Sequence, residues 1–237
     1  MSNNKYRVPS ETVFLPPMKV IWAVTDPNRP ENKFDPEKKA WSLRLVSTNE
    51  ANRKNVEALL GPFLPRFFEM KKAELIEEAG DNKIKLRRLE QGDDKVGPVD
   101  IETPWRERIS RETGEPTGEL ELMLKRDEFR IDRRTKQKVR NAPPLVIDAH
   151  RKPVLLVPPP GSIVIAKMAT WPVFFAADNK IGMKRLLEAC QIVSMPQART
   201  PDASGFEEID DGYSAEDRDE GGSEASSGSR PVAGADY

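Results

Sequence analysis

The sequence contains one cysteine, Cys190, and one histidine, His150, among its 237 residues. A structural zinc site takes about four cysteine or histidine ligands, so zinc fingers and zinc ribbons are excluded. A disulfide framework needs cysteine pairs, and a lone cysteine is typical of a reducing compartment. A Ser-His-Asp triad would depend on His150, which falls in a polar turn at residues 148–151 and is better explained as a surface residue.

Other signs of catalysis or membrane insertion are also missing. Neither of the glycine-rich loops that cradle phosphates, GxGxxG and GxxxxGKS/T, occurs. Apolar runs are short, as in residues 154–157, whereas a membrane span needs about 20 residues. Residues 1–7 are polar with no apolar stretch behind them, so no signal peptide is expected. We therefore expect a cytoplasmic protein with no cofactor and no membrane partner.

Charge is divided along the chain. The whole sequence has 38 Lys+Arg and 39 Asp+Glu, a formal net charge of -1. Residues 200–237 hold 11 of the acidic residues and only two basic ones, so residues 1–199 keep 36 basic against 28 acidic residues, a net of +8. A basic body with an acidic tail points toward nucleic acid as a partner. The alternative is a solvated surface followed by a tail that aids solubility.

The tail, residues 200–237, is dominated by glycine, serine, alanine and acidic residues, with no apolar periodicity. Such a segment cannot bury enough surface to offset its ordering entropy, so a disordered tail is predicted. Three aromatic residues interrupt it: Phe206, Tyr213 and the terminal Tyr237. An aromatic side chain on an acidic string contributes nothing to a core, but it can dock into a basic, apolar pocket on a partner or on the chain's own body.

Apolar and alternating runs predict several short strands. In one of them Trp41, Leu43 and Leu45 share a face that is predicted to be the core, which leaves Arg44 facing outward. The last segment, residues 181–195, fits helix or strand, and strand is favoured. The predicted strands are residues 18–24, 40–46, 120–125, 143–147, 153–157 and 161–175.

Two helices are predicted after the second strand. The capping-box pattern Ser-x-x-Glu at residues 47–50 opens the first, and Gly61-Pro62 ends it. Its apolar face consists of Val56, Leu59 and Leu60. The second helix spans about residues 65–79 and is closed by Gly80.

Residues 81–119 are charged and interrupted by glycine and proline, which predicts a long charged loop or insertion with little regular structure. Trp105 is the one large residue there that we expect to be buried. Short strands with one helical interruption suit a small barrel. We therefore predict a mainly β fold with α (α+β). Residues 1–199 form an OB-like five-stranded barrel with a helical insertion after the second strand, followed by the disordered acidic tail 200–237.

Lysine and arginine interleave with aromatic residues in three sets, a pattern typical of proteins that bind single-stranded nucleic acid through a basic groove and stacking aromatic faces. These sets are Lys19, Trp22, Lys33, Phe34, Trp41 and Arg44; Lys125, Arg126, Phe129 and Arg130; and Lys167, Trp171, Phe174, Lys180, Lys184 and Arg185. We predict all of them except Trp22, Trp41 and Arg185 as DNA-binding. Core packing is the alternative for each tryptophan. Pro172 leaves open whether Trp171 or Phe174 faces DNA.

Short motifs occur in a definite order over most of residues 15–195. The segment VIWAVTDPNRPENKFDPEKKAWSLRLV comes first, then PPLVIDAHRKPV, then a glycine-led strand with aromatics that leads to the turn Asn179-Lys180-Ile181-Gly182. The chain ends in an acidic stretch closed by Asp236-Tyr237. This order resembles the OB-fold single-stranded DNA-binding proteins of tailed bacteriophages. In that family phenylalanine is more usual at the end, and segment 81–119 looks expanded here.

The resemblance implies a protein that is not an enzyme and that coats single-stranded DNA during phage DNA replication and recombination. Its tail, with Asp236 and Tyr237 at the end, would recruit replication proteins such as DNA polymerase. A strand-annealing recombination mediator is the alternative. A phage nuclease or a virion structural protein is less well supported, because acid-x-Lys triplets such as residues 81–83 arise by chance in a chain with 32% charged residues. Assembly into a homo-oligomer is left open.

Removal of residues 200–237 is expected to raise the affinity for single-stranded DNA. The acidic tail mimics the charge of a nucleic-acid strand and competes for the basic body at a high effective concentration. The gain should be largest at low salt, where screening is weakest. Titration of the full-length and truncated proteins with oligo-dT at two salt concentrations measures it. Unchanged or weaker binding by the truncated protein would show that the tail only aids solubility.

Overall fold

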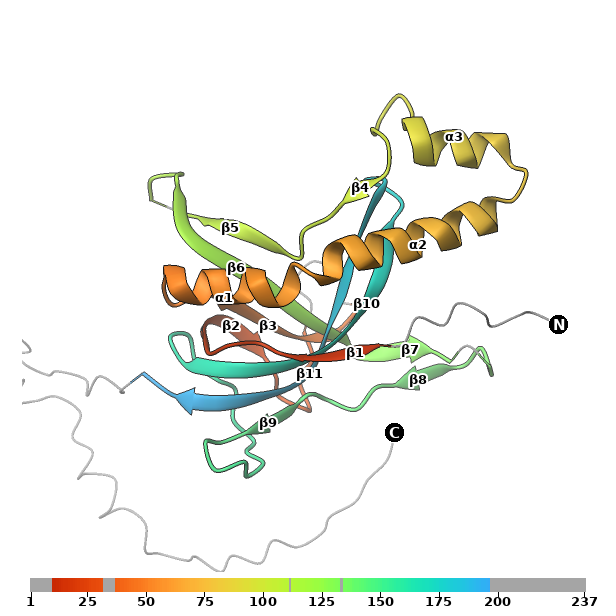
Figure 1. Cartoon of the computed structure of the whole chain (residues 1–237). Helices are drawn as coiled ribbons and strands as arrows, with labels where there is room; N and C mark the ends of the chain where they lie inside the picture. Colours follow the sequence, from red (N-terminus) through yellow and green to blue (C-terminus); the bar gives the residue numbers. More distant parts are fainter. Residues whose placement is uncertain (1–9, 32–36, 111, 133, 197–237) are drawn as a thin grey trace, which may run out of the picture. The chain divides into compact units, whose positions relative to one another are not determined.

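The computed structural model describes residues 10–31, 37–110, 112–132 and 134–196 (Figure 1). The strands are β1 (Glu11–Phe14), β2 (Met18–Val24), β3 (Ala40–Val46), β4 (Asp100–Ile101), β5 (Trp105–Ile109), β6 (Pro116–Asp127), β7 (Phe129–Ile131), β8 (Lys138–Arg140), β9 (Leu145–Ile147), β10 (Ile163–Phe175) and β11 (Lys180–Ser194). The helices are α1 (Glu50–Leu60), α2 (Phe63–Ala79) and α3 (Lys83–Gln91).

Five of these strands close into a barrel. The pairing runs β10, β2, β3, β6, β11, and β11 returns to β10 through a long antiparallel ladder. β6 and β11 meet in parallel at Leu186 and Lys125, while the other neighbours are antiparallel. The predicted OB-like five-stranded barrel with helices after its second strand, here β3, is therefore confirmed.

The barrel interior is filled by the alternating apolar positions of its strands. Leu43 and Leu45 of β3 lie opposite Leu124 and Leu122 of β6, and all four side chains are fully buried. Trp41 is also fully buried, as predicted, and its indole N–H donates to the backbone carbonyl of Asp26 at 2.9 Å. The core face of β3 was therefore predicted correctly, and Trp41 anchors the loop that joins β2 to β3.

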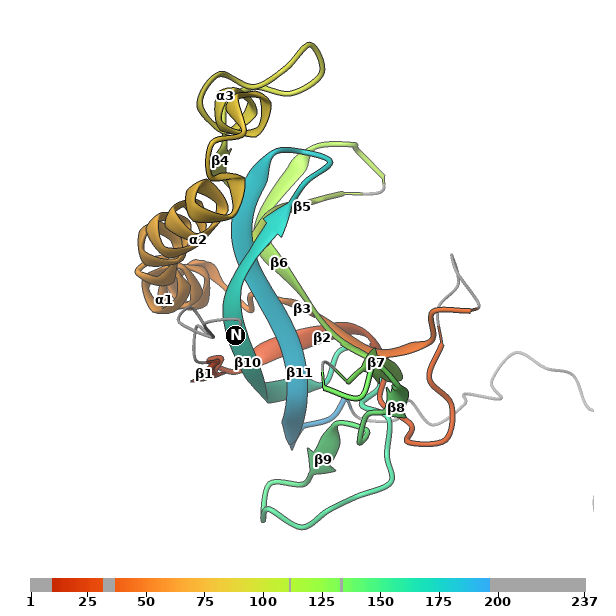
Figure 2. The same cartoon turned by 90° about the vertical axis from the view of Figure 1, so that its right-hand side faces the viewer.

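Helices α1 and α2 lie along one side of the barrel, on the left in Figure 2. Val56 and Leu60 of α1 and Phe67 of α2 reach the barrel core, whereas Leu59, which was predicted on the same face, is partly exposed. The first helix ends at Gly61-Pro62 as predicted, and α2 ends at Gly80, whose φ of 51° is readily adopted by glycine.

The predicted capping box at the start of α1 is wrong. The N-cap is Asn49, whose side-chain oxygen accepts the backbone N–H of Asn52 at 2.8 Å. The Ser47 hydroxyl instead accepts the backbone N–H of Leu120 at 2.9 Å, which ties the end of β3 to β6. Asparagine is as good an N-cap as serine, and here it lies next to the first helical residue.

The prediction of a long loop with little regular structure at residues 81–119 is also wrong, since α3, β4, β5 and the start of β6 lie there. Trp105 is partly buried and packs against the barrel core. The insertion braces the tip of the β10–β11 hairpin. Asn179, buried in that tip with a φ of 50°, donates to the backbone carbonyls of Arg88 at 3.0 Å and Gly97 at 2.8 Å.

The later strand predictions are mixed. β9, β10 and β11 confirm strands in the predicted segments 143–147, 161–175 and 181–195. Residues 153–157 form no strand beyond one bridge between Pro153 and Ile147, and Leu155 is 92% exposed. The strand prediction for residues 153–157 was therefore wrong. A short apolar run, here next to three prolines, does not by itself supply a neighbouring strand to pair with.

Some predictions fall on residues that the structure does not describe. Lys33, Phe34 and the tail 200–237 with Asp236 and Tyr237 lie outside the described residues. In the part of the chain that is described, no helix is long and apolar enough to cross a membrane.

Leu122→Ala should destabilise the protein by about 2–5 kcal/mol, because it leaves a cavity at the centre of the barrel. The matched control is Leu155→Ala, which removes the same atoms from an exposed position and should change the free energy of unfolding by less than about 0.5 kcal/mol. Urea unfolding followed by circular dichroism measures both. Equal effects of the two substitutions would contradict the assigned core.

Candidate nucleic-acid interface

An open groove with a volume of about 790 Å³ lies on the outer face of β2, β3 and β6, and β5 forms one wall. Its lining is mixed, with aromatic, aliphatic, basic and acidic side chains. The lining residues are Ile21, Trp22, Glu31, Ala40, Ser42, Arg44, Arg106, Glu107, Arg108, Ile109, Glu121, Met123 and Lys125.

The strand register sets the order of side chains on the groove floor. Trp22 of β2 lies opposite Arg44 of β3, and Arg44 lies opposite Met123 of β6. In the neighbouring row Ser42 lies opposite Lys125. A register shift in β2 just before Trp22 brings this side chain to the groove, since a β-bulge re-aims the residues around it. The floor therefore carries a row of one aromatic, one guanidinium and one thioether side chain.

A buried carboxylate lies beside this row. Glu121 of β6 is only 4% exposed, and its oxygens accept from Arg44 of β3 at 2.8 Å and from Arg106 of β5 at 2.6 Å. A buried charge is tolerated when it is paired and hydrogen-bonded. Two of the three arginines that line the groove, Arg44 and Arg106, are therefore held by a shared acidic partner.

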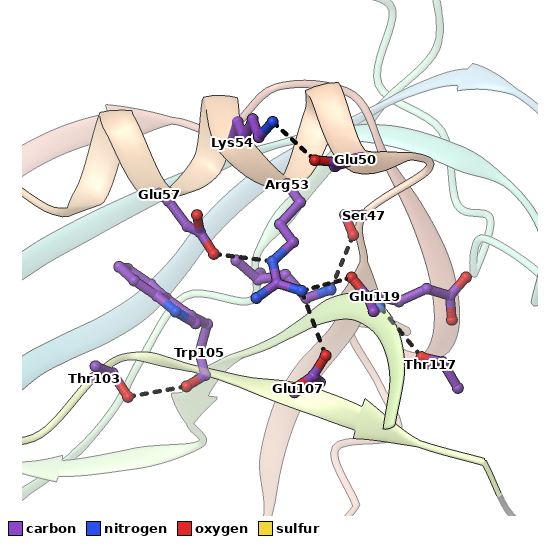
Figure 3. Close-up of polar contacts among 12 residues, drawn as sticks. Ser47, Glu50, Arg53, Lys54, Glu57, Thr103, Trp105, Glu107, Thr117 and Glu119 are labelled. Atoms are coloured by element: carbon purple, nitrogen blue, oxygen red, sulfur yellow. Dashed lines mark hydrogen bonds and ion pairs between the residues drawn. The ribbon is translucent and has the colours of Figure 1, made fainter. Parts of the chain in front are cut away.

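The wall of the groove is held in place from the helix side. Figure 3 shows Arg53 of α1 reaching toward Glu107 of β5, with an N–O separation of 3.4 Å. Arg53 also donates to Glu57 at 3.0 Å and to the backbone carbonyl of Gly118 at 2.9 Å. These contacts raise the pKa of Arg53, first through its hydrogen bond to Glu57. One side chain thus joins α1 to both strands of the β5–β6 hairpin.

The groove is less basic than the composition of the body suggests. Four basic residues line it against three acidic ones. Arg44 and Arg106 share Glu121, and Arg108 pairs with Glu119 at 2.7 Å. The groove therefore combines paired charges with the partly buried Trp22 and the exposed aliphatic side chains of Ile109 and Met123.

Some predicted DNA-binding residues do come together. Lys125 at the groove edge and Lys184 of β11 both approach Asp127, at 3.4 Å and 3.9 Å. Trp171 of β10 lies opposite Lys184 in the ladder and is partly exposed. Because β6, β11 and β10 are consecutive in the barrel, these side chains extend the outer surface from the groove toward β10.

Other predicted residues have different partners. Lys19 pairs with Glu119 at 3.7 Å, and Lys167 pairs with Glu188 at 3.2 Å. Lys180 lies at the braced hairpin tip, where a hydrogen bond to Glu102 at 3.0 Å raises its pKa.

Arg126 and Phe174 have structural contacts. The Arg126 guanidinium donates to the backbone carbonyl of Ala142 at 2.6 Å, and burial lowers its pKa. Phe174 packs against the small core cluster under the insertion, which includes Leu89 and Ile181. Arg185, which was left out of the predicted set, donates to the backbone carbonyl of Pro104, and burial lowers its pKa as well.

The β7–β8 hairpin is a separate two-stranded sheet beside the barrel (Figure 1). Phe129 is 39% exposed, and the Lys138 ammonium lies 4.4 Å from its ring centroid. The base of the hairpin is joined to the β2–β3 loop, because the backbone N–H of Glu128 donates to the carbonyl of Lys39 at 2.9 Å. Arg130 follows Phe129 on β7. Among the residues that the structure describes, it has no ion pair.

The described residues include one cysteine, and its thiol is buried. Cys190 is buried, and burial raises the pKa of its thiol to about 12. No three His, Cys, Asp or Glu side chains in the described ranges are placed to hold a metal ion.

The sequence analysis missed the β5 wall, and with it Arg106, Arg108 and the buried Glu121. A signal was present. Residues 105–109 and 116–127 flank a short polar segment with Gly114, which is the pattern of a hairpin with a longer loop. β5 was overlooked because it is an edge strand with mostly charged side chains.

Neither a protein-family model nor a curated protein matches the sequence. Among solved structures, the single-stranded DNA-binding protein gp2.5 encoded by bacteriophage T7 is similar, with a TM-score of 0.53 and 16% identity over 84% of this chain and 98% of that chain. The chain has the fold of that phage protein. The fold implied by the resemblance in sequence motifs is thereby confirmed.

A second similar structure is the single-stranded DNA-binding protein from bacteriophage Enc34 in complex with ssDNA. It has a TM-score of 0.40 and 10% identity, over 76% of this chain and 85% of that chain.

Trp22→Ala should weaken binding of oligo-dT by about five-fold or more, the effect of losing one stacked base. Trp171→Ala should weaken it less, because Trp171 lies on β10 and is not among the residues that line the groove. Fluorescence anisotropy measures both affinities, and thermal unfolding shows whether each variant is folded. A larger loss for folded Trp171→Ala than for Trp22→Ala would place the stacking surface on β10 and β11.

Proposed function

We propose that the chain binds single-stranded DNA without sequence specificity and does not catalyse a reaction. The observation that carries the proposal is the groove on the outer face of β2, β3 and β6 with its β5 wall. OB folds bind oligonucleotides on the face of their second and third strands, which correspond here to β3 and β6. The T7 protein of the same fold is itself a single-stranded DNA-binding protein, which supports the proposal.

The groove lining favours a single strand over a duplex. Trp22, Met123 and Ile109 give the groove an aromatic and aliphatic surface. Every base has a flat face that can stack on such a surface, so the contact is tolerant of sequence. In a duplex the faces of the bases are already stacked on one another, so none is available to stack on the groove lining. Preference for unpaired strands follows from this difference.

The DNA backbone would follow basic side chains at the edge of the groove. Lys125 lines the groove where β6 continues toward the β7–β8 hairpin, and Arg130 and Lys138 lie on that hairpin. Their contacts with phosphates would release counterions and make the affinity depend on salt. Phe129 offers one further stacking face on the same path.

The proposal extends to a role in the infected cell. Coating of single-stranded DNA during phage DNA replication and recombination, in the host cytoplasm, is the role that the family resemblance supports. Residues 200–237, with 11 acidic residues and the terminal Tyr237, would then recruit replication proteins such as DNA polymerase. The acidic charge and the terminal aromatic residue of this segment support docking to a basic partner surface.

Binding to oligo-dT should exceed binding to a duplex of equal length and should fall steeply as salt rises. For single strands the slope of log affinity against log salt is about -0.7 for each phosphate that the protein neutralises. Anisotropy titrations with the two DNAs over a series of salt concentrations measure both properties of the full-length protein.

Two outcomes would contradict this function. Equal affinity for duplex and oligo-dT would remove the preference for unpaired bases, and salt-independent binding would remove the phosphate contacts. Incubation of the same oligonucleotides with Mg²⁺ tests for cleavage, which should not occur. A strand-annealing assay with two complementary labelled strands tests the recombination-mediator alternative on the same protein.

A further inference from the structure

Glu121, which is paired with two arginines, is a buried carboxylate at an outward-facing position of a strand. Glu121 is the one buried acidic side chain among the described residues. It lies on β6 between Leu120 and Leu122, where its own side chain points to the outer face of the sheet. An outward position on a strand does not need a buried carboxylate, because neutral side chains fit such positions without the desolvation cost. The position of Glu121 in the groove lining therefore points to a role in the groove.

The two arginines are held by their edges. A guanidinium donates its hydrogen bonds within its own plane, so the N–H groups that reach Glu121 from Arg44 and Arg106 are directed toward the floor. Their side chains remain 31% and 68% exposed. The N–H fork that would grip a phosphate is thus partly occupied, while the flat guanidinium faces can still be covered by a ligand.

The neighbours of Arg44 also suit flat ligands. Trp22 lies on one side of Arg44 in the strand register and Met123 on the other. Bases stack on tryptophan and also on arginine guanidinium planes. Pairing with Glu121 also lowers the net positive charge at this point, which weakens attraction for phosphates relative to the edge of the groove.

We propose that Glu121 is a positioning residue that turns Arg44, and with it Arg106, from phosphate-binding groups into surfaces on which unpaired nucleobases stack. The bases of the strand then lie on the row of Trp22, Arg44 and Met123, and the phosphates lie toward Lys125 and the β7–β8 hairpin. This inference rests on the proposed function and specifies which part of the DNA each side of the groove holds.

The test compares two ligands of equal length and charge, oligo-dT and an oligonucleotide made only of abasic sites. Glu121→Gln keeps the shape of the side chain and removes its charge. It should lower the affinity for oligo-dT by about five-fold or more, the effect of one lost stacking contact. The affinity for the abasic strand should hold or rise, because a negative charge has been removed.

Glu119→Gln is the matched control. Glu119 is also on β6 and pairs with an arginine of β5, Arg108, but it is 28% exposed and lies outside the groove lining. Its loss frees Arg108 and Lys19, neither of which lies in the row of Trp22, Arg44 and Met123, so the affinities for the two oligonucleotides should change by the same factor.

Arg44→Lys is the second variant, and it decides the matter if Glu121→Gln unfolds in a thermal melt. Lysine keeps the charge but offers no flat face. It should lower the oligo-dT affinity by about five-fold and leave the abasic affinity unchanged. Equal changes for the two ligands in the folded variants would overturn the inference and assign the arginines to phosphates. Failure of the wild-type protein to bind oligo-dT would instead overturn the proposed function.

Discussion

Alternation of side chains along β6 is the constraint on which both the barrel and the groove depend. Leu120, Leu122 and Leu124 fill the barrel interior, and the intervening Glu121, Met123 and Lys125 line the groove. A slip of one residue in the pairing of β6 with β3 would exchange these two sets, so the buried leucines also fix which side chains line the groove. The packing of the barrel and the lining of the groove are therefore set by the same strand register.

A second consequence concerns charge. The body of the chain has a clear excess of basic residues, yet all three arginines that line the groove are in ion pairs with Glu119 or Glu121. These pairs, two of them with the buried Glu121, hold each guanidinium in a defined direction. In the proposed mode of binding, bases contact the paired floor and phosphates contact Arg130 and Lys138 of the β7–β8 hairpin, whereas Arg140 of the same hairpin pairs with Glu128. Affinity and selectivity for single strands would then depend on different residues.

The sequence was informative wherever a local pattern controlled the outcome. The alternation at residues 40–46 predicted both the buried face of β3 and the outward Arg44, and the glycines predicted where α1 and α2 end. The pattern failed where long-range contacts decide. β5 is a strand because it pairs with β6, and its own charged residues carry little periodicity.

The same limit explains the scattered site residues. Phe174 and Lys180 lie close to Trp171 and Lys184 in the sequence, but the insertion at residues 81–104 surrounds the hairpin tip and gives them other partners. Trp22 was left out of the predicted set, because nothing in its own segment shows that a β-bulge brings it to the groove. Interleaved charges and aromatics identified a class of ligand, while the choice among the aromatics required the fold.

The central claim is that single-stranded DNA lies in the groove, and photo-crosslinking tests this claim most directly. Oligo-dT with single thymines replaced by 5-iododeoxyuridine would be irradiated in complex with the full-length protein, and crosslinked peptides would be identified by mass spectrometry. The account predicts crosslinks at Trp22 and Met123 on the groove floor, with further crosslinks at Phe129. Crosslinks confined to the helices or to the outer face of β10 and β11 would contradict it.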